Sequence, residues 1–430
     1  MTGGPEDPLA PADAAPRGAG REDGWAGRTF AALRVPTYRG FFVGQGVSMV
    51  GSWARSAAQG WLVYDLTGRE LDLGITSALS FLPMALLSAA AGAVVDRVDR
   101  RVLLLRLQLV NLALSSVLAY AVVTRTVTPG LVQLVALAMG TSQAFEMPCR
   151  QAFVADAVPR EHLRNAVALN SAMINLALVL GPSLAGLLIS TVGIAACFVF
   201  DAASFLAVIV VLLRVRLPAR APHPPTASMG ALLLGGVRYV RRDPVTRTLL
   251  LLLAVAMVCG WGYTSLLPAF SRGTLGADGA AYGLLHASSG LGALGAALWV
   301  AGRDDRRPGR TAFGCLFLFW SALALMALVR TLPAAMLLRA TAGFAMIAFF
   351  STSNTTVHLR VPDDLRGRVV GLRALVFGWT LPLGQYLMGV VAERWDTPTA
   401  FLAGACVGCA ACLVLAATRP FLERSPVATR

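Results

Sequence analysis

The stretch FEMPCRQAFVADAVPREHLRNAVALNSAMINLALVLGPSLAG, from Phe145 to Gly186, decides the fold. It begins in an apolar run that Glu146 and Arg150 interrupt, passes through a short polar segment, and enters a second apolar run. Pro159 opens the polar part, and proline suits the first turn of a helix. The stretch therefore predicts two membrane-spanning helices joined by a loop that carries a short surface helix.

The same signature returns in the second half of the chain. VPREHLR at 158–164 is echoed by VPDDLR at 361–366, and GAVVDRVDRR at 92–101 is echoed by GRDDRR at 302–307. Each copy lies between two apolar runs. The sequence therefore predicts two related halves, the parallel repeat of one transporter architecture.

Composition indicates a membrane protein. Of the 430 residues, 56% are hydrophobic and 14% are charged. A hydrocarbon core about 30 Å thick needs about 20 apolar residues per helix. We predict an all-α protein with twelve transmembrane helices in two pseudo-symmetric six-helix bundles. The candidate spans are 40–64, 73–95, 102–124, 130–149, 166–190, 194–213, 247–270, 280–301, 311–329, 333–354, 369–391 and 397–417.

Composition shifts mark the predicted domains. Residues 1–28 are rich in Pro, Ala and Gly and predict a disordered tail. The N-terminal bundle is predicted at 29–213 and the C-terminal bundle at 247–418. A basic, Pro-rich linker at 214–246 separates them, and 419–430 form a second tail.

The net charge of +14 comes from arginine alone, since the 37 basic residues include no lysine. With the N-terminus in the cytoplasm, 30 arginines fall on the cytoplasmic side and Arg55 lies within a span. The rest fall at or near the outer face: Arg69, Arg125, Arg272, Arg330, Arg339 and Arg394. This asymmetry predicts that both termini are cytoplasmic. The all-arginine, alanine-rich composition indicates a bacterial protein, so we expect it in the bacterial plasma membrane. No basic patch is interleaved with aromatic residues, which argues against nucleic-acid binding.

The first span carries a polar stripe. Gln45, Ser52, Arg55 and Gln59 recur at helical spacing and share one face. A charged arginine at bilayer depth costs at least about 2.5–3.5 kcal/mol, so the stripe should face water or a partner. Two interpretations are open: Arg55 lines a substrate pathway, or it pairs with a carboxylate that holds helices together.

Two acidic residues lie within predicted spans, Glu146 and Asp201. A buried carboxylate can change protonation with its access to water, which suits a proton carrier. Alternatively, Glu146 pairs with Arg150 one turn on, and Asp201 is a structural group. The remaining polar candidates for a cavity or pathway are Asn175, His286, Asn354 and Gln385.

The segment GAVVDRVDRR resembles the loop between the second and third spans of the major facilitator superfamily. Its matching residues are Gly92, Asp96, Arg97, Arg100 and Arg101, while Asp99 replaces a glycine. In the family this loop is a latch on the cytoplasmic side. The resemblance implies that Asp96 faces the start of span 11, near 367–370, with Arg150 as a partner. A purely topogenic role of the arginines is the alternative.

The pattern E-x-P-x-R-Q followed by V-P-R-E-x-L-x-N-A, with WLVYDLTG at 61–68 and VPDDLRGR at 361–368, resembles a particular branch of that superfamily. The branch includes the enterobactin exporter and its proton-antiporter relatives. Gly181, Pro182 and Gly186 are similar to an element typical of antiporters, with Ala185 in place of a glycine. This implies export; a kinked packing site without bearing on direction is the alternative.

Other chemistries find little support. Cys406, Cys409 and Cys412 are spaced like metal ligands but are expected to be packing residues in the last span. The glycines at 290, 292 and 295 match a dinucleotide fingerprint but lie within a span and follow no strand. We find no phosphate-binding loop, metal cluster or catalytic triad, so we expect neither an enzyme nor a bound cofactor.

The resemblance implies a monomeric secondary transporter in the lipid bilayer. It would export an amphipathic small molecule, such as a drug, antibiotic or siderophore, by proton antiport and alternating access. A nutrient importer of the same fold and a receptor-like membrane protein that does not transport are the two alternatives.

Overall fold

The computed structural model describes residues 30–215, 229–303 and 308–417, and their regular structure is helical. The predicted tails and part of the predicted linker lie outside the described residues. The first half contains η1 (Ala31–Arg34), α2 (Pro36–Thr67), α3 (Glu70–Val95), α4 (Arg100–Val123), α5 (Pro129–Ala157), η2 (Arg160–His162), α6 (Leu163–Thr191) and α7 (Ala195–Arg214).

The second half begins with α8 (Met229–Arg242), which falls in the predicted linker. An irregular segment follows, made of α9 (Pro244–Val255), the π-helical turn η3 (Ala256–Gly260), the 3-10 helix η4 (Trp261–Leu266), α10 (Leu267–Ala269) and the π-helical turn η5 (Phe270–Thr274). The chain ends with α11 (Gly279–Ala301), α12 (Pro308–Leu328), α13 (Leu332–Arg360), α14 (Asp363–Arg394) and α15 (Thr397–Ala417).

Local sequence explains where many of these helices begin. Asp99, Thr128, Asp243 and Asp278 each precede a helix, and their side chains accept hydrogen bonds from backbone N–H groups of the first turn. Proline occupies the first turn of α2, α5, α9 and α13, where no N–H is needed. Asp99, which departs from the family pattern, thus serves as the cap of α4.

Ten of the helical segments are long and apolar enough to cross a membrane. The helices α2 and α5 do not pass the same test, although they contain 32 and 29 residues. Polar residues such as Gln45 and Glu146 interrupt their apolar runs and are buried within the protein. Interior helices can carry such residues because neighbouring helices separate them from lipid.

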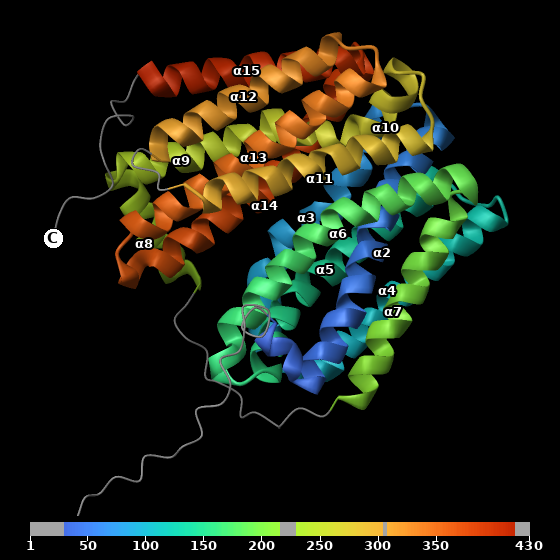
Figure 1. The fold of residues 1–430 in the computed structure, drawn as a ribbon, viewed down its shortest axis with the longest axis vertical. Helices are drawn as coiled ribbons and strands as arrows, with labels where there is room; N and C mark the ends of the chain where they lie inside the picture. Colours follow the sequence, from blue (N-terminus) through green and yellow to red (C-terminus); the bar gives the residue numbers. More distant parts are fainter. Residues whose placement is uncertain (1–29, 216–228, 304–307, 418–430) are drawn as a thin grey trace, which may run out of the picture.

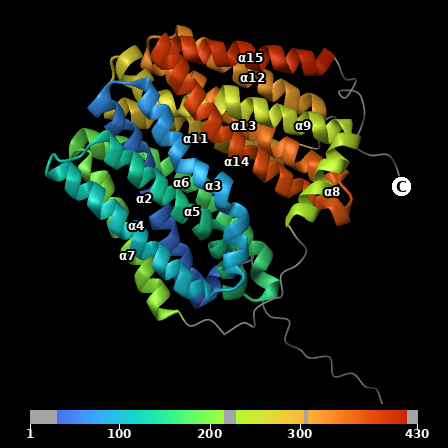
Figure 2. The ribbon, with the colours of Figure 1, turned by 180° about the vertical axis from the view of Figure 1, so that it is seen from behind.

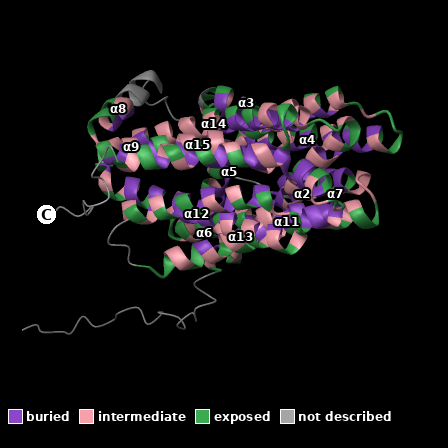
Figure 3. Cartoon of the chain, turned by 90° about the horizontal axis from the view of Figure 1, so that it is seen from above, coloured by how far each residue is buried: buried purple, intermediate pink, exposed green. Residues whose placement is uncertain are grey.

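The helices form two groups side by side (Figure 1). The N-terminal group, α2 to α7, runs from blue to green, and the C-terminal group, α8 to α15, runs from yellow to red. Contact between the groups is made mainly by α3 with α14 and by α6 with α11. Buried residues lie largely where helices face one another (Figure 3).

The two groups touch closely at one end and separate toward the other (Figure 2). Near the first end, a Cβ on Gly74 would lie 3.0 Å from the Cα of Gly389, so the backbones of α3 and α14 meet. Further along the same helices, Gly92, Gly367 and Gly371 have open space around them. We call the end near Gly74 and Gly389 the closed end, and the end near Gly92 and Gly367 the open end.

The predicted span at 247–270 lies within the membrane-crossing segment Pro244–Thr274, but its path is irregular. A Cβ on Gly260 would lie 2.6 Å from Phe319, and a Cβ on Gly262 would lie 2.6 Å from the carbonyl oxygen of Gly384. Glycine at these positions lets the chain pack tightly against α12 and α14 while it leaves the α-helical path. The break turns Trp261, Thr264 and Ser265 toward the space between the groups.

Candidate functional site

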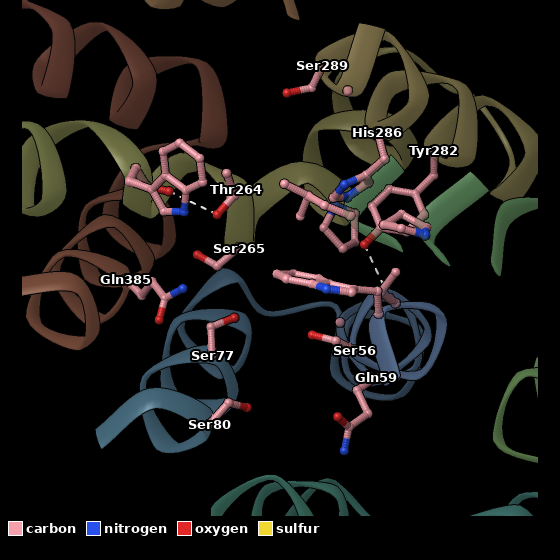
Figure 4. A pocket seen from close by; sticks show the side chains of 18 of the residues that line it. Ser56, Gln59, Ser77, Ser80, Thr264, Ser265, Tyr282, His286, Ser289 and Gln385 are labelled. Atoms are coloured by element: carbon pink, nitrogen blue, oxygen red, sulfur yellow. Dashed lines mark hydrogen bonds between the residues drawn. The ribbon is translucent and has the colours of Figure 1, made fainter. Parts of the chain in front are cut away.

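A cavity of about 150 Å³ lies between the two groups. Its wall combines α2, α3 and α6 with the irregular segment, α11, α13 and α14. The uncharged polar side chains of the wall include Ser56, Gln59, Ser77, Ser80, Thr264, Ser265, Ser289 and Gln385 (Figure 4). Aromatic rings from both groups complete it: Trp53, Phe81, Trp261 and Tyr282. The wall therefore offers hydrogen bonds beside large apolar surfaces, as small-molecule sites do.

Tyr282 links the two groups beside the cavity. Its hydroxyl donates a hydrogen bond to the carbonyl oxygen of Ala57, 3.2 Å away, so α11 is tied to α2 (Figure 4). Its ring packs against Trp61 and, edge to face, against His286, with ring centroids 5.4 and 4.8 Å apart. The Nε2 atom of His286 is buried without a hydrogen-bond partner beside the cavity.

Arg339 is the charged residue of the cavity wall. It lies two turns into α13, is 5% exposed, and donates a hydrogen bond to the hydroxyl of Tyr263. Its guanidinium carbon also lies 4.8 Å from the centroid of the same ring. The sequence analysis placed Arg339 at or near the outer face. The structure shows that its side chain is buried in the cavity wall.

Arg55 and Asp201 form an ion pair inside the N-terminal group. The Nε atom of Arg55 lies 3.0 Å from the Asp201 carboxylate, which is 0% exposed. Asp201 also accepts hydrogen bonds from Ser115 at 2.8 Å and Ser52 at 3.3 Å. This pair links α2 to α7, and the hydrogen bond from Ser115 links α4 to the same carboxylate. Arg55 thus has the carboxylate partner of the second interpretation and does not line the cavity itself.

Gln59 connects this pair to the cavity. Its amide oxygen accepts a hydrogen bond from Nη1 of Arg55 at 2.5 Å, while its Nε2 atom is left without a partner in the cavity wall. A continuous polar path therefore runs from the cavity through Gln59 and Arg55 to Asp201. Gln45, from the same predicted stripe, is buried outside the cavity wall.

Glu146 lies in a separate buried cluster between α4 and α5. It is 5% exposed and accepts hydrogen bonds from Asn111 at 3.1 Å and Gln108 at 3.3 Å. Nη1 of Arg150 lies 3.9 Å from the same carboxylate, so the pairing considered from the sequence is present. This cluster does not contribute to the cavity wall.

Ion pairs between the groups fasten the closed end. Nε of Arg69, after α2, lies 2.8 Å from Glu393 of α14, which also accepts a hydrogen bond from the backbone N–H of Leu71. Asp65, at the end of α2, pairs with Arg272 of η5. The sequence analysis did not anticipate these contacts, because partners more than 200 positions apart leave no local pattern.

The loop predicted as a latch lies at the open end. The Asp96 side chain is 66% exposed, and its carboxylate is 3.9 Å from Arg100. Arg100 pairs with Asp156 as well, and Arg101 donates to the carbonyl oxygens of Leu212 and Leu213. The contact of Asp96 with α14 that the resemblance implies is not made here, because α3 and α14 have diverged at this end.

The remaining predicted residues have different surroundings. Gly181 packs against α2, where a Cβ would lie 2.8 Å from the Val50 carbonyl oxygen, and Pro182 lines the cavity. Gly186 packs against α11 at Gly279 and Gly283. Gln385 lines the cavity as predicted, whereas Asn175, Asn354 and Arg97 are exposed outside its wall. Asn175 donates to the carbonyl oxygen of Ser171 in its own helix.

Comparison with known proteins agrees with this architecture. A family model described as a transmembrane secretion effector matches residues 27–425, nearly the whole chain. The chain belongs to this family of the major facilitator superfamily. Members of the superfamily are membrane transporters and not enzymes, so the cavity between the groups is the candidate transport site.

The chain resembles several bacterial efflux and transport proteins. It is 28% identical to the multidrug efflux pump Tap of Mycolicibacterium fortuitum, over 80% of this chain and 86% of that protein. It is 25% identical to the staphyloferrin A transporter of Staphylococcus aureus, over 82% and 89% of the two chains. It is 22% identical to macrolide efflux protein A of Streptococcus pyogenes, over 82% and 88%.

Solved structures share the fold. A bacterial homologue of the human lysosomal transporter Spinster, inward-facing and unoccupied, matches with a TM-score of 0.69 over 91% of this chain and 96% of that one. The nucleoside transporter NupG matches with a TM-score of 0.66 over 90% and 100%. Their sequences are 14% and 15% identical to this chain, so the likeness concerns the fold.

Proposed function

We propose that this protein exports an amphipathic small molecule from a bacterial cytoplasm in exchange for protons. In this proposal twelve transmembrane helices form two six-helix bundles, residues 29–213 and 247–418, joined by a cytoplasmic linker at 214–246. The bundles rock about the cavity and expose it to one side of the plasma membrane at a time. The protein works as a monomer without a bound cofactor.

The cavity carries this proposal. It is walled by both groups, closed at one end by the Arg69–Glu393 and Asp65–Arg272 pairs, and flanked at the other end by diverging helices. A binding site between two rigid bodies that touch at one end is what alternating access requires.

The distribution of arginine supports an orientation in which the open end faces the cytoplasm. Near the closed end lie Arg69, Arg125, Arg272, Arg330 and Arg394. The loops and helix ends of the open end carry more: Arg97, Arg100, Arg101, Arg160, Arg164, Arg214, Arg241, Arg242, Arg303, Arg360, Arg366 and Arg368. Arginine accumulates on the cytoplasmic side of membrane proteins. The structure then corresponds to the state that loads cargo from the cell.

Two observations support export of an amphipathic cargo. The relatives include a multidrug efflux pump and a macrolide efflux protein. The cavity wall alternates rings such as Trp53 and Trp261 with hydroxyl and amide groups, so it can hold a cargo with an apolar body and a polar part.

We assign proton coupling to Asp201. Its carboxylate is buried, and the path through Arg55 and Gln59 reaches the cavity. Protonation of Asp201 would release Arg55 and rearrange Gln59, so cargo and proton would compete through one hydrogen-bonded chain. Each charge carried inward gains about 2.3 kcal/mol per 100 mV of membrane potential. Glu146 is the second candidate, but its cluster is separated from the cavity wall.

Proteoliposomes with an imposed pH gradient test both parts of the proposal. Wild-type protein is expected to move a fluorescent amphiphile against its gradient only when protons flow the other way. Asp201→Asn should lose this driven transport at least about tenfold but keep exchange of cargo for cargo, which needs no net proton movement. Glu146→Gln should keep both gradient-driven transport and exchange of cargo for cargo.

Three outcomes contradict the proposal in different places. Accumulation that ignores the pH gradient excludes antiport. If gradient-driven transport survives in Asp201→Asn but is lost in Glu146→Gln, the proton-coupling residue is Glu146 and not Asp201. Uptake in the opposite direction indicates an importer.

A further inference from the structure

Arg339 is a buried cation of the cavity wall, and its contacts among the described residues include no carboxylate. It donates to the Tyr263 hydroxyl, and its Nε atom is buried without a hydrogen-bond partner. By contrast, Arg55 and Arg150 in the N-terminal group each have a buried carboxylate, Asp201 and Glu146, within 4 Å. The wall of the cavity contains no Asp or Glu among the described residues.

An unpaired guanidinium at this place is costly. Moving an arginine to the middle of a bilayer costs at least about 2.5–3.5 kcal/mol, and buried charges are therefore normally paired. The stacking of Arg339 on the Tyr263 ring offsets part of this cost, since such cation–π contacts contribute about 0.5–2 kcal/mol. The Nε atoms of Arg55 and Arg150 also lack a hydrogen-bond partner, so what distinguishes Arg339 is the missing counterion, and the cavity is the space next to it.

Further groups around the cavity fit an acceptor of negative charge. His286 has its Nε2 atom buried without a partner, and a neutral imidazole can donate one hydrogen bond. Ser289, one turn on from His286 along α11, also lines the cavity. Trp53 and Trp261 provide flat apolar surfaces in the same wall.

We infer that the cavity selects cargo that carries an anionic oxygen group, such as a carboxylate, attached to a flat apolar body. Arg339 binds the anionic group and His286 is placed to donate to it, while the tryptophans contact the body. Cationic amphiphiles are disfavoured, because no acid of the wall balances their charge. This inference rests on the proposed function and names the chemical class of its cargo.

A matched pair of dyes tests the charge preference directly. Fluorescein and the methyl ester of the parent rhodamine share one three-ring framework, but fluorescein is an anion at neutral pH and the ester is a cation. Fluorescence polarisation measures their binding to the full-length protein in nanodiscs of neutral phosphatidylcholine, with empty nanodiscs as background. Wild-type protein is expected to bind fluorescein at least about tenfold more tightly than the ester, as a charge-assisted contact implies.

Variants locate the preference at Arg339. Arg339→Gln should weaken fluorescein binding at least about tenfold and leave the cationic ester unchanged or improved, whereas Arg339→Lys should keep part of the preference because the charge remains. Arg330→Gln is the matched control, since Arg330 is exposed at the closed end and bonds to backbone carbonyl oxygens. Each variant is included only if it elutes as a single peak, and Arg339→Lys covers the case in which Arg339→Gln does not fold.

The inference is overturned if wild-type protein does not bind fluorescein, if it binds the ester equally well or better, or if Arg339→Gln and Arg339→Lys both keep full fluorescein affinity. Transport of the two dyes in proteoliposomes separates this failure from failure of the proposed function. Gradient-driven export without charge preference leaves the proposed function standing and removes the inference. Charge-selective binding without gradient-driven movement supports the charge preference of the cavity and contradicts the proposed proton-driven export.

Discussion

At the scale of single residues, the interior of the N-terminal group depends on two charge clusters. Asp201 is fully buried and touches Arg55, Ser52 and Ser115, so it connects three helices. Removal of one partner of a buried pair leaves the other charge unsatisfied, which costs more than the pair contributes as a whole.

We therefore expect Asp201→Asn to lower the stability of the protein by about 3–5 kcal/mol, because Arg55 loses its counterion. The double variant Arg55→Gln/Asp201→Asn should recover much of this loss. Thermal unfolding of the wild type, both single variants and the double variant in detergent gives the stability changes of the double-mutant cycle. Arg366→Gln is the control, since its pair with Asp363 is exposed. Additive losses from the two single variants would show that the pair does not couple.

Sequence alone predicted part of this residue-scale arrangement. The spacing of Gln45, Ser52, Arg55 and Gln59 predicted one polar face, because helical periodicity is local. The sequence could not reveal that Asp201 is the partner of Arg55, since helix rotation and order depend on packing between distant segments. For a related reason the sequence could not show that Arg339 lines a cavity, because α11 and the irregular segment form that cavity around it.

At the scale of helices, Asp243 joins the start of α9 to the end of α13. It accepts hydrogen bonds from the backbone N–H of Thr246 at 2.9 Å and from Nη2 of Arg360 at 3.1 Å. Burial raises the pKa of Asp243, but the hydrogen bonds from Thr246 and Arg360 and the charge of Arg360 outweigh it, so the pKa lies below its ordinary value. Asp243 lies outside the membrane-spanning segments.

The sign of the pH effect follows from this lowered pKa. The carboxylate stabilises the fold fully above its unfolded pKa of about 3.9, and the contribution is lost as pH falls through the lower folded value. Asp243→Asn should therefore be less stable than wild type by about 1–2 kcal/mol at pH 7. The gap should begin to narrow below about pH 4 and shrink further as pH falls toward 3. Melting curves of both proteins between pH 7 and pH 3 measure it, and a gap that does not depend on pH would contradict the assignment.

Glycine contacts set how closely α6 and α11 approach. A Cβ on Gly186 would lie 2.8 Å from the carbonyl oxygen of Gly279 and from the backbone nitrogen of Gly283. Gly186→Ala should therefore destabilise the protein by about 1–3 kcal/mol, as overpacking does, because backbone atoms cannot move aside. Gly314→Ala in α12 meets open space and should be neutral or slightly stabilising. Equal melting temperatures for the two variants would refute the close contact.

The sequence predicted the positions of the helices well, but it did not predict where a helix departs from regular α-helical geometry. Length and hydropathy placed a helix at every predicted span, since apolar runs of this size have few alternatives in a membrane. The helices extend beyond the predicted limits, as α13 does to Arg360, because polar helix ends can project from the bilayer. The irregular path from Ala256 to Thr274 was not predicted, since Gly260 and Gly262 break the helix only by packing against α12 and α14.

At the scale of the whole molecule, the closed end is fastened by exposed ion pairs between the groups. Such pairs are weak individually and are screened by salt. The pair of Arg69 with Glu393 is supported by the hydrogen bond from Leu71, so Glu393 contacts the last residue before α3 and the first turn of α3. Weak contacts suit an end that opens and closes, as the proposed alternating access requires.

Glu393→Gln is expected to shift the population toward separation of the closed end, by a few-fold and at most about tenfold. Double electron–electron resonance between spin labels at Leu66 and Trp395, which are both exposed, measures the distance distribution across this end. The labels require a background in which the native cysteines are replaced. High salt should shift the wild type in the same direction.

The charge swap Arg69→Glu/Glu393→Arg should restore the wild-type distribution, since the pair is re-formed with opposite polarity. Arg366→Gln, at the other end of α14, is the control and should leave the distribution unchanged. If Glu393→Gln leaves the distance distribution as it is in the wild type, the ion pair does not hold the closed end.

The short helix α8 decides how the chain could be divided. It lies on α14, where Gly236 faces the backbone of Arg368, and the hydroxyl of Tyr239 donates to the carbonyl oxygen of Arg360. Since α8 packs on the C-terminal group, a gene cut between Val215 and Met229 would keep each group of helices on one fragment. Two separately encoded polypeptides should then copurify as a working heterodimer, which means that this transporter could have been assembled in evolution, or in the laboratory, from two independent genes.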